Sequence, residues 1–546
     1  MNESNVISFV FNIHLPFVRE TEPQFIYEEL PFFELISLSF IPFLEMLDRL
    51  DADHIPFHIT LVMPPLLCQL LTDELLVKRY LEYVDKQIAF GQKEIIRCKS
   101  KPKLLKLAQF YYESTIDKRF LFVERYNKNI PSALSYYARR GNVELVTTAA
   151  INAYLPFYIN YPSSISAQIE TALVSHKQFF KERPQGFWLP ELAYCEGLDR
   201  LIRYYKFEWT IIDTHTALLS RPYPEYGSYY PLKTQKGLSL LVKDFYAYKE
   251  IMDRKSGCSV NPVFRSYFGD VGFELPKSYV IDFISARGIR LATGCKYYTK
   301  KQNGKSKGIY HGEKAAKAAK AAAQDFVSNR AKSLSEARET MNKTPLSLCV
   351  LPFDYFGRFW YEGWTFIEEV FKGGAEEPAL EFMTPSAYLA KENAHEFQII
   401  SPEYSSSGFH GYAEAYLDSS NIWVYRHLLR SVERMIELSE RFTEETDIRE
   451  RVLNQAAREV LLAMDTDWAR FTADGEQYIS SEWRRYAQYQ LRHHLRNFTT
   501  LYESLGNSQL STRFLTDLES RNNVFPNINY RSFRRKKKKV ANQNEK

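Results

Sequence analysis

The sequence predicts an α/β protein built on a parallel sheet or barrel, followed by an all-helical domain. Three observations support this prediction. Apolar β-rich stretches alternate with helical stretches through the first 213 residues, and the apolar stretches end in polar residues. Two of them, far apart in the chain, end in a proline and then an acid. From about Ser420 the chain is amphipathic and largely free of strand signals.

The bulk composition indicates a globular protein of two or three domains, because 546 residues exceed one simple core. The formal charge is +5, but the run Arg534–Lys539 alone supplies six positive charges. The rest of the chain is therefore near neutral, which argues against a nucleic-acid-binding body. We expect the basic run to be a solvated tail, with a polyanion contact as the alternative.

The cysteines and the N-terminal segment bear on the compartment. Six cysteines lie far apart without metal-ligand spacing, so we expect no cysteine-built zinc site and a reducing environment. The first residues lack a basic n-region, and we find no run of 18 or more apolar residues. The expectation is a cytoplasmic protein without a membrane span.

The first half of the chain reads as strands and helices in turn. Val6–Ile13 is a buried strand, and His14 directly after it is either a ligand contact or an ordinary surface histidine. His58–Leu71 reads as a strand, a Pro-Pro break and a helix. Residues 72–140 look like a helical insertion. A third strand, Val143–Thr148, leads into a loop that carries Asn152.

The stretch GFWLPELAY, Gly186–Tyr194, places an acid at a strand exit. Its apolar run ends at Pro190, Glu191 follows, and Trp188 stands three residues before the acid. A carboxylate beside a large aromatic ring at the end of a core strand is typical of a sugar-cleaving site. The alternative is that the acid caps the helical stretch that follows.

The second half repeats that pattern once. Residues 221–275 are rich in Pro, Gly and Tyr and look like long loops over a site, and Lys305–Arg338 reads as a strong helix. Leu346–Gly363 is again an apolar strand, a proline and an acid, Asp354, with Trp360 close behind. A parallel barrel would bring both acids to one face, which glycoside cleavage requires.

The C-terminal part is predicted to be a helical bundle over residues 416–525, after a catalytic domain of residues 1–415. A polar break between two of its helices carries Asp467 and Trp468. The last residues, 526–546, are expected to form a basic disordered tail.

Several motifs together resemble those of family-57 glycoside hydrolases. They are GFWLPELAY, HLPFVR near the start, GNVELVTTAAINAYLPF, the Asp354 segment, TPSAYLAK and the helical C-terminal part. The closer match is to the α-1,4-glucan branching enzyme group, and it runs from about residue 6 to about 505. The resemblance implies a (β/α)7 barrel, a distorted TIM-like barrel with inserted helices, and a C-terminal helical domain. It also implies a retaining mechanism with no metal and no cofactor.

The resemblance assigns roles to individual residues. Glu191 matches the nucleophile and Asp354 the acid/base. Matching substrate-binding positions are His14, Trp188, Trp360, Asp467, Trp468 and Tyr229, the last in a loop over the cleft where Tyr226 and Tyr230 compete for the same role.

The sequence also departs from the family pattern. Asn12 and Asn152 stand where the family has histidines, and the loop after Asp354 is shorter, with Arg358 in place of a histidine. Asparagine can hydrogen-bond a hydroxyl group but cannot titrate.

The function expected first is that of a branching enzyme. It would cleave an α-1,4 bond of glycogen, amylose or a maltooligosaccharide through a glucosyl-Glu191 intermediate and transfer the chain to a 6-hydroxyl. The alternatives are an α-1,4-glucanotransferase or α-amylase-type hydrolase with the same site, and a glucan-binding protein with little activity. No nucleic-acid or membrane partner is expected.

Overall fold

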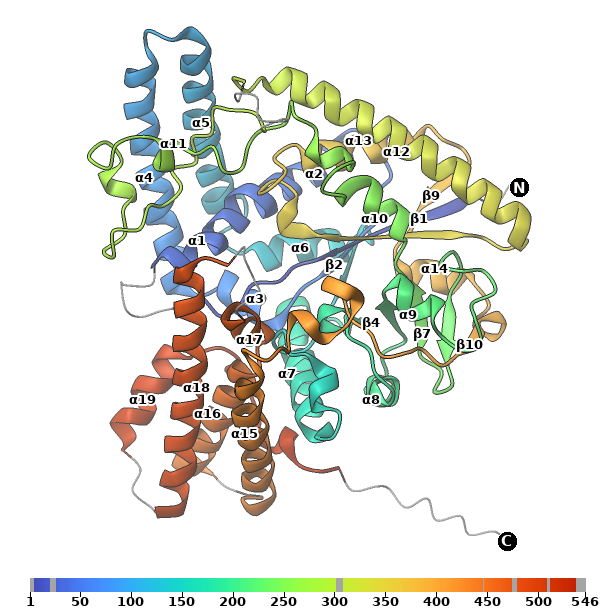
Figure 1. The fold of residues 1–546 in the computed structure, drawn as a ribbon, viewed down its shortest axis with the longest axis vertical. Helices are drawn as coiled ribbons and strands as arrows, with labels where there is room; N and C mark the ends of the chain where they lie inside the picture. The colour runs from blue at the N-terminus through green and yellow to red at the C-terminus, as the bar shows by residue number, and fades with distance from the viewer. Residues whose placement is uncertain are drawn as a thin grey trace.

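The computed structural model describes residues 4–19, 26–300, 308–444, 446–473, 479–507 and 511–536, and a parallel barrel lies at its centre (Figure 1). Within these ranges the barrel strands are β1 (Asn5–Asn12), β2 (Ile59–Val62), β3 (Val143–Val146), β4 (Gly186–Phe187), β5 (Trp209–Ile212), β7 (Ser239–Val242) and β8 (Leu346–Pro352). They pair in two runs, β3-β2-β1-β8 and β4-β5-β7, and all of these pairs are parallel.

Two single contacts close these runs into a ring. A parallel bridge between Thr147 and Phe187 joins β3 to β4. The backbone N–H of Asp244, just after β7, donates to the Leu348 carbonyl of β8 at 2.9 Å. The prediction of a distorted (β/α)7 barrel is therefore confirmed.

The barrel interior is packed rather than open. Alternate residues of β1 face opposite sides. Val6 and Val10 join the interior cluster with Trp209 of β5 and Val350 of β8, whereas Phe9 packs outward against the helices. Asn12 continues the inward-facing series by the same period of two, so it lies where the interior opens at the carboxyl ends of the strands.

The remaining barrel-domain elements lie around this core. The helices are α1 (Ile26–Glu34), α2 (Ile41–Ala52), α3 (Pro65–Leu71), α4 (Glu74–Cys98), α5 (Pro102–Phe120), α6 (Ile130–Arg139), α7 (Pro162–Phe180), α8 (Leu198–Tyr204), α9 (Thr214–Leu218), α10 (Phe245–Met252), α11 (Val271–Glu274), α12 (Gly312–Met341), α13 (Gly363–Ala375) and α14 (Pro385–Lys391). Three short strands extend the sheets, β6 (Leu232–Thr234), β9 (Leu380–Phe382) and β10 (Gln398–Ile400). The pair α4 and α5 projects from the barrel (Figure 1).

One helical stretch, Tyr27–Ala52, is long and apolar enough to cross a membrane by length and composition. In this structure 72% of its apolar window is buried inside the protein. A π-helical segment, η2 (Leu35–Phe40), joins α1 to α2 within it. The stretch thus serves here as a core helix, and its π-helical turn packs on the segment that follows β8.

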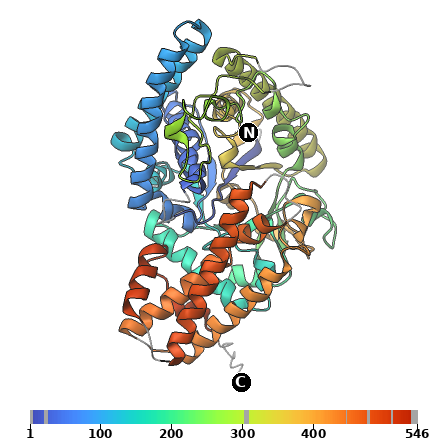
Figure 2. The ribbon, with the colours of Figure 1, turned by 60° about the vertical axis from the view of Figure 1, so that its left-hand side comes forward.

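The C-terminal domain is helical, as predicted. Its helices are α15 (Ile422–Arg441), α16 (Asp447–Ala463), α17 (Thr466–Thr472), α18 (Ser481–Asn507) and α19 (Thr512–Arg521). Figure 2 shows these orange and red helices beside the barrel, with one end of the bundle against it.

The prediction of a disordered tail over residues 526–546 is wrong for its first part. Residues up to Lys536 are ordered, and a short helix, η12 (Tyr530–Phe533), packs on α7, α15 and α16. Tyr530 and Phe533 are completely buried, and the Lys536 ammonium contacts Glu170 of α7 at 2.6 Å. Apolar side chains among the charged ones anchor this segment. Residues 537–546 lie outside the described ranges.

Candidate active site

Glu191 lies directly beyond β4 in a strained backbone. It occupies a short turn, η5 (Pro190–Leu192), with φ 58° and ψ 19°, a left-handed conformation that costs a non-glycine residue about 1–3 kcal/mol. Neighbouring hydrogen bonds hold it there. The Trp188 N–H donates to the Thr147 carbonyl at 2.9 Å, and the Ser407 N–H donates to the Glu191 carbonyl at 2.7 Å. Strain maintained in this way is characteristic of a functional residue.

Three donors from two segments hold the Glu191 carboxylate. The Asn152 amide donates to Oε1 at 2.6 Å. The Tyr416 hydroxyl donates to Oε2 at 2.5 Å, and the Ser407 hydroxyl reaches the same oxygen at 3.3 Å. Burial, together with the charge of Glu191, raises the pKa of Tyr416, so this hydroxyl stays protonated as a donor. Sequence reasoning missed Tyr416 and Ser407, since neither lies at the end of a strand.

Asp354 lies beyond β8, in the turn η8 (Phe353–Tyr355), and its side chain is half-buried. Burial raises the pKa of Asp354, and the charges of Arg358 and His14 offset only part of this effect. A raised pKa favours the protonated carboxyl group, which is the form that a proton donor needs. The charge of His14 also interacts with Glu191. The charge of His14 thus interacts with both Glu191 and Asp354, two acids that lie far apart in the sequence.

The arginine in the shortened loop links Asp354 to the core helix. Arg358 Nη1 lies 3.5 Å from Asp354 Oδ2, while its Nε donates to Glu34 Oε2 at 2.9 Å. The Tyr267 hydroxyl donates to the same Glu34 oxygen at 2.9 Å. Burial opposes ionisation of Glu34, but the charges of Arg358 and Lys296 outweigh it and hold the pKa of Glu34 below its usual value. The sequence indicated Arg358 but gave no sign of its partner.

His14 connects the barrel to the C-terminal domain. Its Nε2 lies 2.6 Å from Asp467 Oδ2, at the start of α17. Burial alone would lower the pKa of His14, but the Asp467 charge outweighs it and raises the pKa to about 9. Asp465 lies beside this pair, and burial together with the Asp467 charge raises its pKa. Among the described residues, His14, Asp465 and Asp467 form the group whose donor atoms, within 4.8 Å of one another, have the spacing of a cation site. Two features argue against a bound cation here. Asp467 is already paired with His14, and Asp465, whose pKa is raised, would have to lose its proton to act as a ligand.

The first turn of α17 also contacts the loop that holds Glu191. The Thr466 N–H and hydroxyl both donate to the Asn152 carbonyl, at 2.9 and 2.5 Å. Asn152 in turn donates to Glu191. The helical domain is therefore part of the construction of the site.

The predicted aromatic contacts need correction. Trp360 and Trp468 are completely buried. Trp360 packs against phenylalanines, and the Trp468 indole donates to the Leu462 carbonyl at 2.8 Å. In this structure neither ring is accessible to a sugar, and both support the framework. Trp188 is 7% exposed and belongs to the cluster inside the barrel beneath Glu191.

Tyr229 does not lie over the cleft. Its carbonyl accepts a hydrogen bond of 2.8 Å from the N–H of Leu346, the first residue of β8, whereas Asp354 lies two residues beyond the other end of that strand. The strand has seven residues, and its two ends lie about 20 Å apart. The side chain packs instead with Tyr226, Tyr230 and Met341. The expected loop thus lies at the opposite end of the barrel, because the chain between α9 and β6 returns there to pair with β7.

Comparisons with known proteins agree with this architecture. Residues 8–252 match the model of glycosyl hydrolase family 57, and residues 427–533 match the C-terminal domain of 1,4-α-glucan branching enzymes. A curated relative, the 1,4-α-glucan branching enzyme TK1436 of Thermococcus kodakarensis, is 25% identical over 95% of this chain and 77% of its own length.

Two solved structures share the fold along nearly the whole chain. The α-amylase AmyC of Thermotoga maritima is 29% identical, with a TM-score of 0.89 over 98% of this chain and 100% of its own. A family-57 branching enzyme of Pyrococcus horikoshii is 20% identical, with a TM-score of 0.86 over 98% and 97%. The two family matches, in this order along one shared fold, show that the chain is similar to glycoside hydrolase family 57 in its first half and to the branching-enzyme C-terminal domain in its last part.

Proposed function

We propose that this enzyme acts on α-glucans with retention of configuration, cleaving an α-1,4 bond and transferring the released chain to a 6-hydroxyl. The observation that carries the proposal is the contrast between the two acids. Glu191 is held by three donors in a strained turn, whereas burial raises the pKa of Asp354. Two carboxyl groups whose environments differ in this way suit a nucleophile and a proton donor.

In the proposed first step, Glu191 attacks the anomeric carbon while Asp354 protonates the departing glycosidic oxygen. Tyr416 and Asn152 fix the two oxygens of Glu191, so that one lone pair is directed at the sugar. In the second step, ionised Asp354 removes a proton from the acceptor hydroxyl, which attacks the glucosyl–Glu191 ester and releases Glu191. We place His14 beside the same sugar, because its charge interacts with both acids.

Transfer to a 6-hydroxyl is the first candidate because of the branching-enzyme C-terminal domain and the relative TK1436. Hydrolysis is a second candidate, and two observations favour it. The Tyr229 loop lies at the other end of the barrel, and AmyC, which is named as an α-amylase, is 29% identical. Water in place of a sugar hydroxyl at the second step would make the enzyme a hydrolase.

Product analysis on amylose distinguishes these reactions. New reducing ends that appear only after treatment with a debranching enzyme support transfer to a 6-hydroxyl. Ends that appear before this treatment indicate hydrolysis, and redistributed linear chains without branches indicate α-1,4 transfer. We expect Glu191→Gln to lose at least about 10⁴-fold in kcat, whereas Glu196→Gln, an exposed acid five residues away, keeps it. Full activity of Glu191→Gln would contradict the assignment.

We also propose a cytoplasmic setting. All six cysteines are free, and four of them are buried, which supports a reducing compartment. Preparation under oxidising and reducing conditions, followed by thiol counting, tests whether the enzyme keeps all six as thiols.

A further inference from the structure

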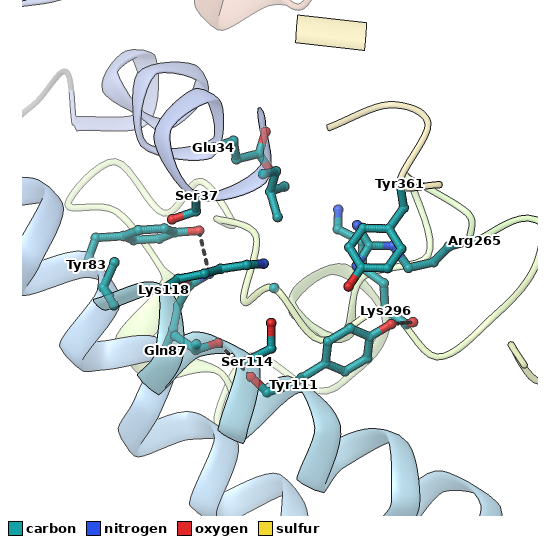
Figure 3. Close-up of a pocket in the computed structure, with 14 residues that line it drawn as sticks. Glu34, Ser37, Tyr83, Gln87, Tyr111, Ser114, Lys118, Arg265, Lys296 and Tyr361 are labelled. Atoms are coloured by element: carbon teal, nitrogen blue, oxygen red, sulfur yellow. Dashed lines mark hydrogen bonds between the residues drawn. The ribbon is translucent and has the colours of Figure 1, made fainter. Parts of the chain in front are cut away.

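A small internal cavity lies between the projecting helices and the core helix, outside the catalytic pair. It measures about 40 Å³ and is lined by α4 and α5, by the π-helical segment of the core helix, and by the chain around Arg265, Lys296 and Tyr361. A single water needs about 10–15 Å³, so the space holds about three waters or one small ion. Figure 3 shows Lys118 and Arg265 directed toward it from opposite sides.

The cavity wall carries more positive than negative charge. Its cations are Lys118, Arg265 and Lys296, and its one carboxylate is Glu34. Glu34 is already neutralised by Arg358 at 2.9 Å, and Lys296 lies 3.9 Å from Asp270. Among the described residues, no carboxylate lies within 4.0 Å of a side-chain nitrogen of Lys118 or Arg265. Lys118 and Arg265 therefore face the cavity without a direct ion pair. The charges of Glu45 and Asp117 reach Lys118, and that of Glu362 reaches Arg265, only at longer range.

Arg265 is the more unusual of the two. It is 3% exposed, and its Nη2 atom has no hydrogen-bond partner. Its guanidinium stacks on the Tyr361 ring at 3.7 Å, which fixes its plane but leaves that nitrogen unsatisfied. An unpaired buried charge is expensive, so such a group normally has a partner. Burial and the nearby Arg265 charge lower the pKa of Lys118 to about 8, because the charges of Glu45 and Asp117 offset these effects only in part.

We propose that this cavity is a binding site for a small inorganic anion, held by Arg265 and Lys118. An anion would accept a hydrogen bond from the unsatisfied Arg265 Nη2 and neutralise both cations. The volume admits an ion such as chloride or phosphate but no sugar. Glu34 lines the cavity and also holds Arg358, so this residue of the cavity wall lies two contacts from Asp354.

Binding is tested without reference to activity. Isothermal titration of the full chain with inorganic phosphate, and separately with chloride, at constant ionic strength should give saturable binding of at least one of them. Lys118→Gln, whose side chain is only half-buried, should weaken this binding about 10-fold or more, since it removes a charge-assisted hydrogen bond. Lys106→Gln, an exposed lysine of the same helix, is the matched control and should bind as the wild type does.

Circular dichroism and unfolding curves establish that both variants are folded before titration. Saturable binding that is lost in Lys118→Gln and kept in Lys106→Gln supports the site. No saturable binding of either anion by the wild type, or unchanged affinity in Lys118→Gln, overturns it.

Discussion

The contact between Arg358 and Asp354 gives a pH prediction whose sign follows from the structure. Arg358→Gln removes a positive charge 3.5 Å from an Asp354 oxygen. That charge favours the carboxylate, so its loss raises the pKa of Asp354 further above its usual range. The carboxyl group then keeps its proton to higher pH. Glu34, which loses its arginine partner, adds a negative charge that acts in the same direction.

The expected shift can be bounded by Coulomb's law. Two unit charges 3.5 Å apart interact by about 1.2 kcal/mol in water and about 4.7 kcal/mol at an effective dielectric constant of 20. The Asp354 side chain is 31% exposed, so the value for water is the safer bound. At 1.36 kcal/mol for each pH unit, this corresponds to a shift of at least about 0.9 unit.

The assay is the pH dependence of kcat/KM on a soluble maltooligosaccharide. Its basic limb reports the loss of the proton from the essential acid, so the limb should move to higher pH in Arg358→Gln. Arg49→Gln makes the same change of charge in a half-exposed pair with Glu368 and should leave the limb in place. Arg358→Gln also breaks the buried pair between Arg358 and Glu34, at a cost of about 3–5 kcal/mol in stability. The folding of this variant is therefore checked first. A basic limb that stays fixed or moves to lower pH would refute the role of Asp354 as the acid.

Three further changes test other parts of the construction. Gly357→Ala should lower kcat about 10²-fold, because the added Cβ would lie 1.7 Å from a carbonyl oxygen of the π-helical turn and displace the Asp354 loop. The control for backbone strain alone is Gly141→Ala, since Gly141 has a φ of +80° and its added Cβ would meet no atom within 4 Å. Deletion of residues 523–546 should lower the free energy of unfolding by about 5–9 kcal/mol, since three buried aromatic rings are lost. A chain that ends at Lys536 should keep its stability. Equal urea midpoints for these two shortened chains would contradict this prediction. In Asp467→Asn, urea unfolding should no longer depend on pH through the histidine pair. The raised histidine pKa contributes stability that is complete below about pH 6.5 and lost as the pH rises through about 9, so a wild-type slope retained in the variant would count against the pair.

The barrel and its two acids could be predicted from the sequence because they depend on local pattern. Apolar strands that end in proline and acid recur at Glu191 and Asp354, and parallel strands bring such ends to one face. The tryptophans could not be placed in this way. The sequence around an aromatic residue near an acid does not indicate whether the ring is exposed to a ligand or buried. Both Trp360 and Trp468 are buried. The prediction for Tyr229 was wrong for a different reason. The direction in which its loop returns is set by pairing between strands that are distant in sequence.

Asn152 shows most clearly what the sequence could not supply. Taken alone, it is a family histidine replaced by a group that cannot titrate, which suggests weakened chemistry. In the structure its amide holds the nucleophile at 2.6 Å, while its carbonyl accepts two hydrogen bonds from Thr466, 314 residues further along. This residue thus links the helical domain to Glu191, through its backbone carbonyl on one side and its side-chain amide on the other. The asparagine amide does not titrate, so it donates to Glu191 at every pH. A histidine at this position would titrate near neutral pH, so the replacement keeps the hydrogen bond to the nucleophile independent of pH.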